Sequence, residues 1–239
     1  MNALSDLHAE IDKHGICWIG KDENGAKHHL FAPKFEAYGK TPRLNRQIHI
    51  SEKLDGTNVG IVIDERGGVW PQSRNRQIRP GKDTDHHGFA HWAIDNADAL
   101  RDTLGPGRHF GEWVGPKIGP RNYGLTENHL YLFNPRHAEA VEASGLDRLH
   151  IVPQLGVWDT FDSELIGSIL NLLVQVGSQI APARKFVRPE GVIIYHSASG
   201  QVFKVLADND DLPKGEASEV EHVHSYQGLP ARTMVGVAA

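Results

Sequence analysis

The sequence is poor in cysteine and lacks long apolar runs. Its 239 residues include a single cysteine, Cys17, so no disulfide can form within the chain. A reducing compartment is the natural setting for such a protein, and we expect it to be cytoplasmic. No apolar stretch approaches the ~18 residues that a transmembrane helix needs. The segment from Met1 to Asp12 carries acids instead of the apolar core of a signal peptide. We therefore expect no membrane association.

The chain also lacks the overall positive charge that is typical of proteins that bind nucleic acids. Its formal net charge is -5, with 39% hydrophobic and 23% charged residues, which indicates an ordinary globular protein. One segment is nevertheless locally positive: it contains Arg74, Arg76, Arg79 and Lys82 with no acid between them. Such a cluster indicates either a solvated face or a site for a polyanion.

The spacing of apolar residues predicts an α+β fold. Ser163 to Ile180 has the clearest helical spacing, and the turns at 64–68 and 197–200 each separate two alternating segments. We expect helices over 4–13, 86–104 and 163–180, and strands over 47–51, 59–63, 69–70, 109–114, 129–133, 192–195 and 202–206. Strands in hairpins, with helices inserted between them, predict antiparallel sheets flanked by helices.

The most informative segment is 51–58, Ser-Glu-Lys-Leu-Asp-Gly-Thr-Asn. Lys53 lies between Glu52 and Asp55, directly after a predicted strand, and Gly56 follows closely. A lysine amine attacks phosphorus only when it is neutral, and its usual pKa is about 10.4. Burial, nearby cations or a metal-bound triphosphate that holds the amine in line can make the attack feasible. Gly56 allows the backbone to approach a nucleotide closely. A surface loop before a hairpin is the alternative interpretation.

Further segments follow in an order that resembles the covalent nucleotidyltransferase superfamily of ATP-dependent DNA ligases, RNA ligases and mRNA capping enzymes. Lys53-Leu54-Asp55-Gly56 is similar to the nucleophile motif of this superfamily. The other similar segments are Ser73-Arg74, Phe110 to Trp113, Leu130 to Asn134, Glu190 to Ile193, and Phe203 to Val205. The resemblance implies an α+β nucleotidyltransferase domain, related to ATP-grasp-like ligases, of antiparallel sheets flanked by helices.

The resemblance also implies roles for single residues. Lys53 is the residue that becomes adenylated, Glu112 binds the ribose and Phe133 stacks on the purine. The full set comprises catalytic Lys53, Lys204 and Glu190; nucleotide-binding Glu52, Lys53, Asp55, Asn58, Arg74, Glu112, Phe133 and Lys204; metal-binding Glu190 and Asp55; and nucleic-acid-binding Arg74, Arg76 and Arg79. Oxygen ligands of this kind suit Mg²⁺ or Mn²⁺.

Within the superfamily, the details favour RNA ligases. Glu52 directly before the nucleophile, Asn58, and Gly111 to Gly115 followed by Arg121 to Leu125 resemble the type-2 RNA ligases. This branch implies that ATP is used to form a lysyl-AMP intermediate. The AMP is then transferred to a 5′-phosphate end, which is sealed to a 3′-hydroxyl in nicked or broken RNA.

Two features depart from the pattern of the family. The last motif usually has two lysines separated by one residue, but Val202 and Leu206 stand where a partner for Lys204 is expected. Few residues follow Lys204, so we expect an adenylyltransferase domain over 1–215 and a polar tail over 216–239, without a separate C-terminal domain. A protein partner could replace that domain. The alternatives are a DNA ligase, a GTP-using capping-type enzyme, and an inactive nucleic-acid-binding module with this fold.

Overall fold

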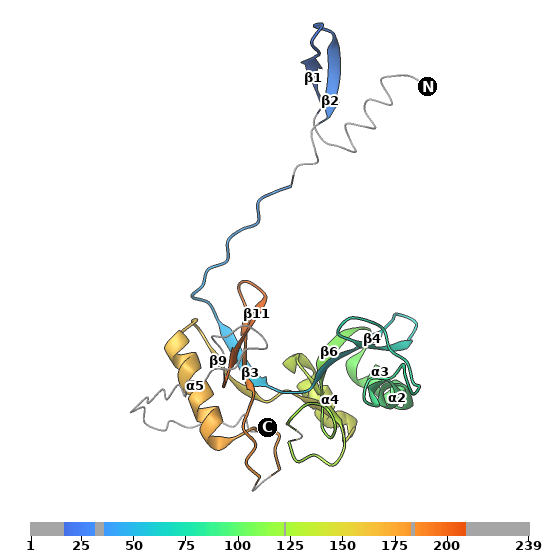
Figure 1. The fold of residues 1–239 in the computed structure, drawn as a ribbon, viewed down its shortest axis with the longest axis vertical. Coiled ribbons are helices and arrows are strands. Elements are labelled where there is room, and N and C mark those ends of the chain that lie inside the picture. The colour runs from blue at the N-terminus through green and yellow to red at the C-terminus, as the bar shows by residue number, and fades with distance from the viewer. Residues whose placement is uncertain (1–16, 32–35, 122, 183–184, 209–239) are drawn as a thin grey trace. The chain divides into compact units, whose positions relative to one another are not determined.

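The computed structural model describes residues 17–31, 36–121, 123–182 and 185–208 (Figure 1). The chain divides into two units, the first ending at Pro42 and the second beginning at Arg43. In the first unit, β1 (Cys17–Lys21) pairs antiparallel with β2 (Lys27–Phe31) in a hairpin that the sequence did not predict. The predicted helix over 4–13 and the predicted tail over 216–239 lie outside the described residues.

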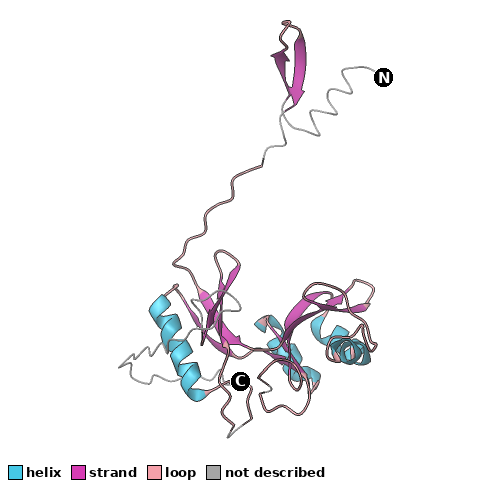
Figure 2. Ribbon diagram, in the orientation of Figure 1, coloured by secondary structure: helices cyan, strands magenta, loops and turns pink. Residues whose placement is uncertain are grey.

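The second unit has a mixed α+β fold built on two sheets, which confirms the predicted fold class (Figure 2). The strands are β3 (Ile48–Lys53), β4 (Thr57–Ile63), β5 (Val69–Ser73), β6 (Gly107–Val114), β7 (His129–Leu132), β8 (Leu149–Ile151), β9 (Gln154–Trp158), β10 (Gly191–His196) and β11 (Gln201–Leu206). The helices are α2 (Phe89–Asp95), α3 (Ala97–Leu104), the 3-10 helix η1 (Pro135–His137), α4 (Ala138–Ser144) and α5 (Ser163–Val176). Among the described helices, none combines the length and apolar character that crossing a bilayer requires.

The strand order is β11-β10-β3-β9 in the four-stranded sheet and β5-β4-β6-β7-β8 in the five-stranded sheet. The neighbouring strands in both sheets are antiparallel, except that β7 and β8 run parallel. Both predicted hairpins are present, as β4–β5 and β10–β11. The parallel pair differs from the expectation of purely antiparallel sheets, because the chain passes through α4 between β7 and β8.

Helix α5 covers one face of the four-stranded sheet. The Asp162 side chain caps it by accepting hydrogen bonds from the backbone N–H groups of Glu164 and Leu165, at 2.9 and 3.2 Å. Ile166 and Leu173 on its apolar side pack against the buried alternating residues of β3 and β10, which are Ile48, Ile50, Val192 and Ile194. The alternation places His49, Ser51 and Lys53 on the opposite face of this sheet.

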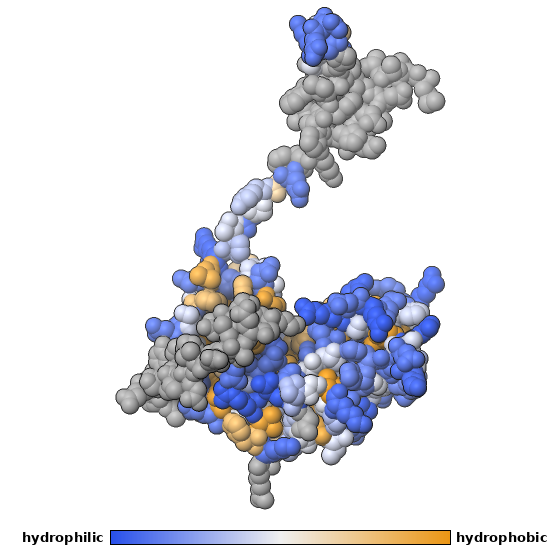
Figure 3. Space-filling view, viewed as in Figure 1, coloured by the Kyte–Doolittle hydropathy of each residue, from blue (hydrophilic) through white to orange (hydrophobic). Residues whose placement is uncertain are grey.

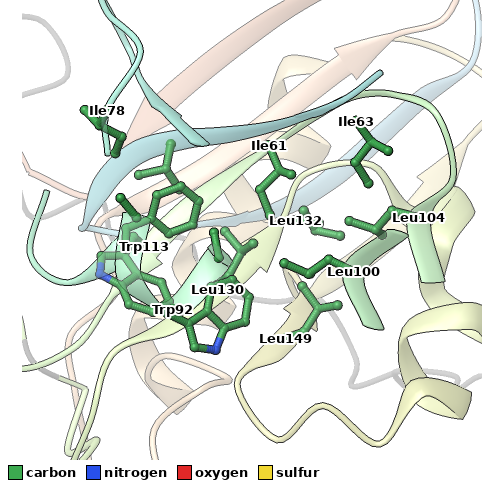
Figure 4. Close-up of a cluster of buried hydrophobic side chains, with 14 of the residues drawn as sticks. Ile61, Ile63, Ile78, Trp92, Leu100, Leu104, Trp113, Leu130, Leu132 and Leu149 are labelled. Carbon is green, nitrogen blue, oxygen red and sulfur yellow. The ribbon is translucent and has the colours of Figure 1, made fainter. Parts of the chain in front are cut away.

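The larger core lies between one face of the five-stranded sheet and helices α2, α3 and α4 (Figure 4). Ile61, Leu100, Trp113 and Leu130 are among its fully buried side chains. The prediction of one helix over 86–104 is wrong, because the helix is interrupted at Asn96. The side-chain amide of Asn96 donates a hydrogen bond of 2.8 Å to the carbonyl oxygen of Trp92. Asparagine side chains compete in this way with the helical backbone and favour a break.

A third cluster joins the two sheets. It consists of Leu54, Val114, Tyr123, Tyr131 and Val152. Leu54 follows directly after β3, and Val152 lies between β8 and β9, so the chain crosses from one sheet to the other at both positions. The end of β3 is therefore fixed at the junction of the sheets, where side chains from both can meet.

Candidate active site

Lys53 is the last residue of β3 and forms an ion pair at the junction of the two sheets. Its Nζ lies 2.6 Å from Oε2 of Glu190, and the side chains are only 22% and 24% exposed. The strand register explains the contact, because Lys53 pairs with Gly191, the residue that follows Glu190. Oε2 of Glu190 is buried and lacks a hydrogen bond of regular geometry, so its contact with Lys53 is ionic.

Glu112 on β6 faces the same amine from the five-stranded sheet. The pKa of Glu112 is raised to about 7, chiefly by burial and in smaller part by the negative charges of Glu190 and Asp55. The positive charge of Lys53 and a hydrogen bond from the Gly56 N–H oppose this rise. The Lys53 amine therefore interacts with the carboxyl groups of Glu190 and Glu112, and the charge of Asp55 acts on Glu112. This arrangement concentrates negative charge where a cation or the amine must balance it.

Asp55 is held by the loop that follows β6. Nη1 of Arg121 lies 2.7 Å from Oδ2 of Asp55, and the backbone N–H of Asp55 donates a 2.6 Å hydrogen bond to the Tyr123 hydroxyl. Nε of Arg121 also donates to the carbonyl oxygen of Arg188, at 3.0 Å. Arg121 thus connects the segment of the nucleophile to the segment that leads into Glu190. The sequence placed Arg121 and Tyr123 in a segment that resembles type-2 RNA ligases but assigned neither of them a role.

Gly56 is required by close packing between β4 and β6. A Cβ atom on Gly56 would lie 2.5 Å from the carbonyl oxygen of Trp113 and 2.9 Å from Cγ of Glu112. Both distances are far below van der Waals contact. The glycine therefore allows the chain that leaves Asp55 to run directly past Glu112, which brings the two acids into one site.

Residues of the five-stranded sheet that face this site lie in two neighbouring rows. Asn58, Glu112 and Tyr131 are direct partners across β4, β6 and β7. Phe110, two residues before Glu112, shares its face, and the Phe133 N–H donates a 3.0 Å hydrogen bond to the Phe110 carbonyl oxygen. Phe133 and Phe110 are both 42% exposed and line a cavity of about 210 Å³. The structure thus places Phe133 one row away from Glu112, with an accessible ring.

Lys204 lies on the same face of the four-stranded sheet as Lys53. It pairs with Ile193, which pairs with Ser51, two residues before Lys53 on β3. The Lys204 side chain is exposed. Leu206, at the position where the family pattern has a second lysine, pairs with Gly191 and so lies in the row of Lys53.

Glu52 points to the opposite face of β3 from Lys53. It is 1% exposed, and its Oε2 accepts a 2.8 Å hydrogen bond from the backbone N–H of Gln179, in the loop after α5. Burial raises the pKa of Glu52, and the hydrogen bond from Gln179 acts in the opposite direction. Glu52 therefore does not join the carboxyl groups around Lys53.

The predicted nucleic-acid residues Arg74, Arg76 and Arg79 lie in the turn after β5 and are exposed. The turn is closed by a 2.8 Å hydrogen bond from the Ser73 N–H to the Arg76 carbonyl oxygen. Within the described residues, none of the ion pairs involves these three arginines. Their charges are available to a polyanion, as expected for a basic turn of this kind.

The donor set around Lys53 fits a hard divalent cation that arrives with a substrate. Carboxylate oxygens of Glu190, Glu112 and Asp55 are the candidate ligands; Oε2 of Glu190 is paired with Lys53, and Oδ2 of Asp55 is paired with Arg121. Across the described ranges, no group of three or more His, Cys, Asp or Glu side chains is arranged to hold a metal by itself. Mg²⁺ characteristically uses one or two carboxylates together with water and substrate phosphates.

Comparisons with known proteins show the family and the fold. The RNA ligase family model matches residues 46–206. A Naegleria gruberi RNA ligase mutant with AMP and Mn is similar in structure, with 16% identity, a TM-score of 0.53, and coverage of 69% of this chain and 50% of that chain. A second Naegleria gruberi RNA ligase mutant, without ligand, has 14% identity and a TM-score of 0.50, with coverage of 85% and 80%. The chain thus spans about half the length of the first structure. At this identity the likeness shows the fold. None of the curated proteins compared with the chain matches it.

Proposed function

Since the chain belongs to the RNA ligase family, we propose that it is an ATP-dependent RNA ligase with Lys53 as the nucleophile. The convergence of Lys53, Glu190 and Glu112 at the junction of the sheets carries this proposal. Glu190 can accept the proton that the amine must lose before it attacks, and an exposed lysine on the same sheet face supplies a cation for the phosphate. Surface lysines seldom have such surroundings.

In the first step, the neutral amine of Lys53 attacks the α-phosphorus of ATP. A nitrogen–phosphorus bond forms, the bond to the bridging oxygen breaks, and pyrophosphate leaves with the electron pair. Glu190, whose Oε2 lies 2.6 Å from the amine, is placed to take the amine proton. Lys204 stabilises the charge that develops on the α-phosphate oxygens, because it lies exposed on the face of Lys53.

The two later steps use the same cluster. An oxygen of an RNA 5′-phosphate attacks the phosphorus of lysyl-AMP, and the bond to Lys53 breaks. A 3′-hydroxyl then attacks the phosphorus of the activated end, and AMP leaves. The exposed guanidinium of Arg74 directly follows β5 and suits contact with the 5′-phosphate end, and Arg76 and Arg79 extend the positive surface.

The nucleotide is held mainly from the five-stranded sheet. We place the adenine on the ring of Phe133 and the ribose hydroxyls against Glu112 and Asn58. Glu112 and Asn58 are partners in one row, and Phe133 lies in the neighbouring row. With a pKa of about 7, the Glu112 carboxyl group can accept or donate a hydrogen bond to a hydroxyl at neutral pH. Mg²⁺ or Mn²⁺ held at Glu190 neutralises phosphate charge when it is bound. The single cysteine, Cys17, supports a cytoplasmic location.

The proposal is tested with ATP labelled at the α-phosphate. We expect the wild-type protein to acquire acid-labile label in the presence of Mg²⁺ or Mn²⁺, and Lys53→Ala to acquire none. Lys117→Ala serves as a matched control, because this lysine lies outside the cluster. Label on Lys53→Ala equal to that on the wild type would refute the assignment.

The same assay separates the competing functions. Labelling from GTP in preference to ATP indicates a capping-type enzyme, and sealing of DNA nicks but not RNA nicks indicates a DNA ligase. RNA binding without any labelling indicates an inactive binding module.

A further inference from the structure

An exposed row of apolar and aromatic side chains crosses the four-stranded sheet on the face opposite α5. We call this row the aromatic row; it consists of Val157 on β9, His49 on β3, Tyr195 on β10 and Val202 on β11. The strand register makes each residue the direct partner of the next. Val157, Tyr195 and Val202 are 53%, 41% and 60% exposed, and the His49 and Tyr195 rings meet edge to face at 5.8 Å.

The side chains of this row are exposed, whereas those on the opposite face of the sheet are buried. There, the alternate residues Ile48 and Ile194 are buried beneath α5. Figure 3 shows apolar patches on the surface around the four-stranded sheet and α5, whereas the end that carries the five-stranded sheet is mostly hydrophilic. Contiguous exposed apolar side chains mark interaction sites more often than solvated surface.

The aromatic row is aligned with the nucleophile. One row lies between them on this face: His49 is four positions before Lys53 on β3, and the intermediate row contains Ser51, Ile193 and Lys204. Four residues of a strand span roughly 13 Å. A ligand that reaches from the aromatic row to Lys53 on this face therefore passes the ammonium group of Lys204.

The charges on this face suit an anion. The aromatic row and the row of Lys204 contain no acidic side chain, and Gln154 is the partner of Ser51 at the β9 edge. Glu190, directly before β10, forms an ion pair with Lys53. Open sheets with aromatic residues on strands, flanked by cations, bind single-stranded RNA by stacking bases on the rings and pairing phosphates with the cations.

We propose that this face binds the unpaired nucleotides adjacent to the RNA end that is being joined. Bases stack on Tyr195 and His49, and Lys204 binds a phosphate on the path to Lys53. The inference rests on the proposed ligase function and names the RNA-binding surface of the same site. It commits to RNA because the row is in register with the nucleophile and has a cation between them.

The experiment compares Tyr195→Ala with Tyr195→Phe. Leu172→Ala is the control, because Leu172 is 45% exposed on α5, which packs on the other face of the sheet. RNA affinity is measured with a single-stranded oligonucleotide that carries 2-aminopurine near its 5′-phosphate, and AMP labelling from ATP is measured in parallel. Replacing a stacking aromatic by alanine weakens binding by about ten-fold or more.

We expect Tyr195→Ala to lose about ten-fold in RNA affinity and to quench 2-aminopurine less, while Tyr195→Phe and Leu172→Ala match the wild type. AMP labelling of Tyr195→Ala should equal that of the wild type, since ATP does not need this row. Unchanged RNA affinity in Tyr195→Ala would overturn the inference. Equal losses in Tyr195→Ala and Tyr195→Phe would also overturn it, because stacking needs only the ring.

Other occupants give distinct results. If Tyr195→Ala leaves RNA affinity unchanged but increases protease cleavage within residues 1–42 or 209–239, the row binds another part of the same chain and the inference is overturned. If the wild-type protein acquires no AMP label, the proposed function fails, and the RNA-affinity comparison still decides whether the aromatic row binds RNA.

Discussion

Replacing Glu112 by glutamine should stabilise the nucleotide-free protein at alkaline pH while it weakens the first reaction step. The pKa of Glu112 rises from 4.5 to about 7, chiefly because burial disfavours its charged form. A pKa difference of one unit corresponds to about 1.4 kcal/mol, so the raised pKa of Glu112 means that its ionised form destabilises the folded protein by about 3 kcal/mol. Glu112→Gln keeps the size of the side chain and removes this cost.

The sign follows from proton binding in the two states. Between pH 4.5 and about 7, folded Glu112 retains a proton that the unfolded chain releases. The contribution of Glu112 to the free energy of unfolding therefore falls as pH rises through this window. Above it, both states are ionised and the full cost is present. We expect Glu112→Gln to exceed the wild type in free energy of unfolding by about 3 kcal/mol at pH 8, and by about 1 kcal/mol at pH 5.

Urea unfolding of the nucleotide-free proteins at the two pH values measures this difference. Glu142→Gln is a suitable control, because Glu142 on α4 is exposed and should give no pH-dependent gain. An equal difference at pH 5 and pH 8, or a less stable Glu112→Gln at pH 8, would contradict the reasoning.

Glu112→Gln should also label more slowly with AMP, because the carboxylate is lost from the ribose site. Together these results would show that the buried charge of Glu112 lowers the free energy of unfolding while it supports the labelling reaction.

Three further predictions concern the surroundings of Lys53. Arg121→Gln removes the ionic link to Asp55, so the AMP-labelling rate should fall more than ten-fold with little change in the KM for ATP; a change in KM alone would contradict a positioning role. Gly56→Ala places a Cβ 2.5 Å from a carbonyl oxygen, so its free energy of unfolding should fall by about 1–3 kcal/mol, as measured in urea, and unchanged stability would oppose this. Arg76→Ala combined with Arg79→Ala should weaken RNA binding and reduce the slope of log affinity against log salt by about 1–2, whereas an unchanged slope would exclude phosphate contacts there.

Local signals in the sequence account for the strands that form the site. Alternation around Ile48 and Ile61 and the turn glycines predict β3, β4 and the two hairpins. In the second unit, the elements that were missed are β8, β9 and α4, which are short or have weak periodicity, and the main partner of β9, β3, is remote in sequence. Register between remote strands depends on packing across the sheet, which a single sequence does not display.

The site itself was predictable to the extent that residues lie in motifs. Lys53, Glu112 and Glu190 were predicted from short segments; the register of β3 and β10 brings Lys53 next to Glu190, and Glu112 approaches from β6 of the other sheet. Arg121 lay in a segment that resembled the family but received no role, because its contact depends on a loop that folds back 66 positions to reach Asp55. The burial of Glu52 was also not predicted, because the predicted strand ended at Ser51, whereas β3 continues to Lys53 and its alternation sends Glu52 to the buried face.

The most direct test of the central claim is to find the atom that carries AMP. The protein is incubated with ATP and Mg²⁺, digested, and its peptides are analysed by mass spectrometry. We expect one adduct, on the peptide that contains Lys53, and we expect added pyrophosphate to remove it by regenerating ATP. An adduct on another lysine, or no adduct under conditions in which RNA ends are joined, would contradict the account.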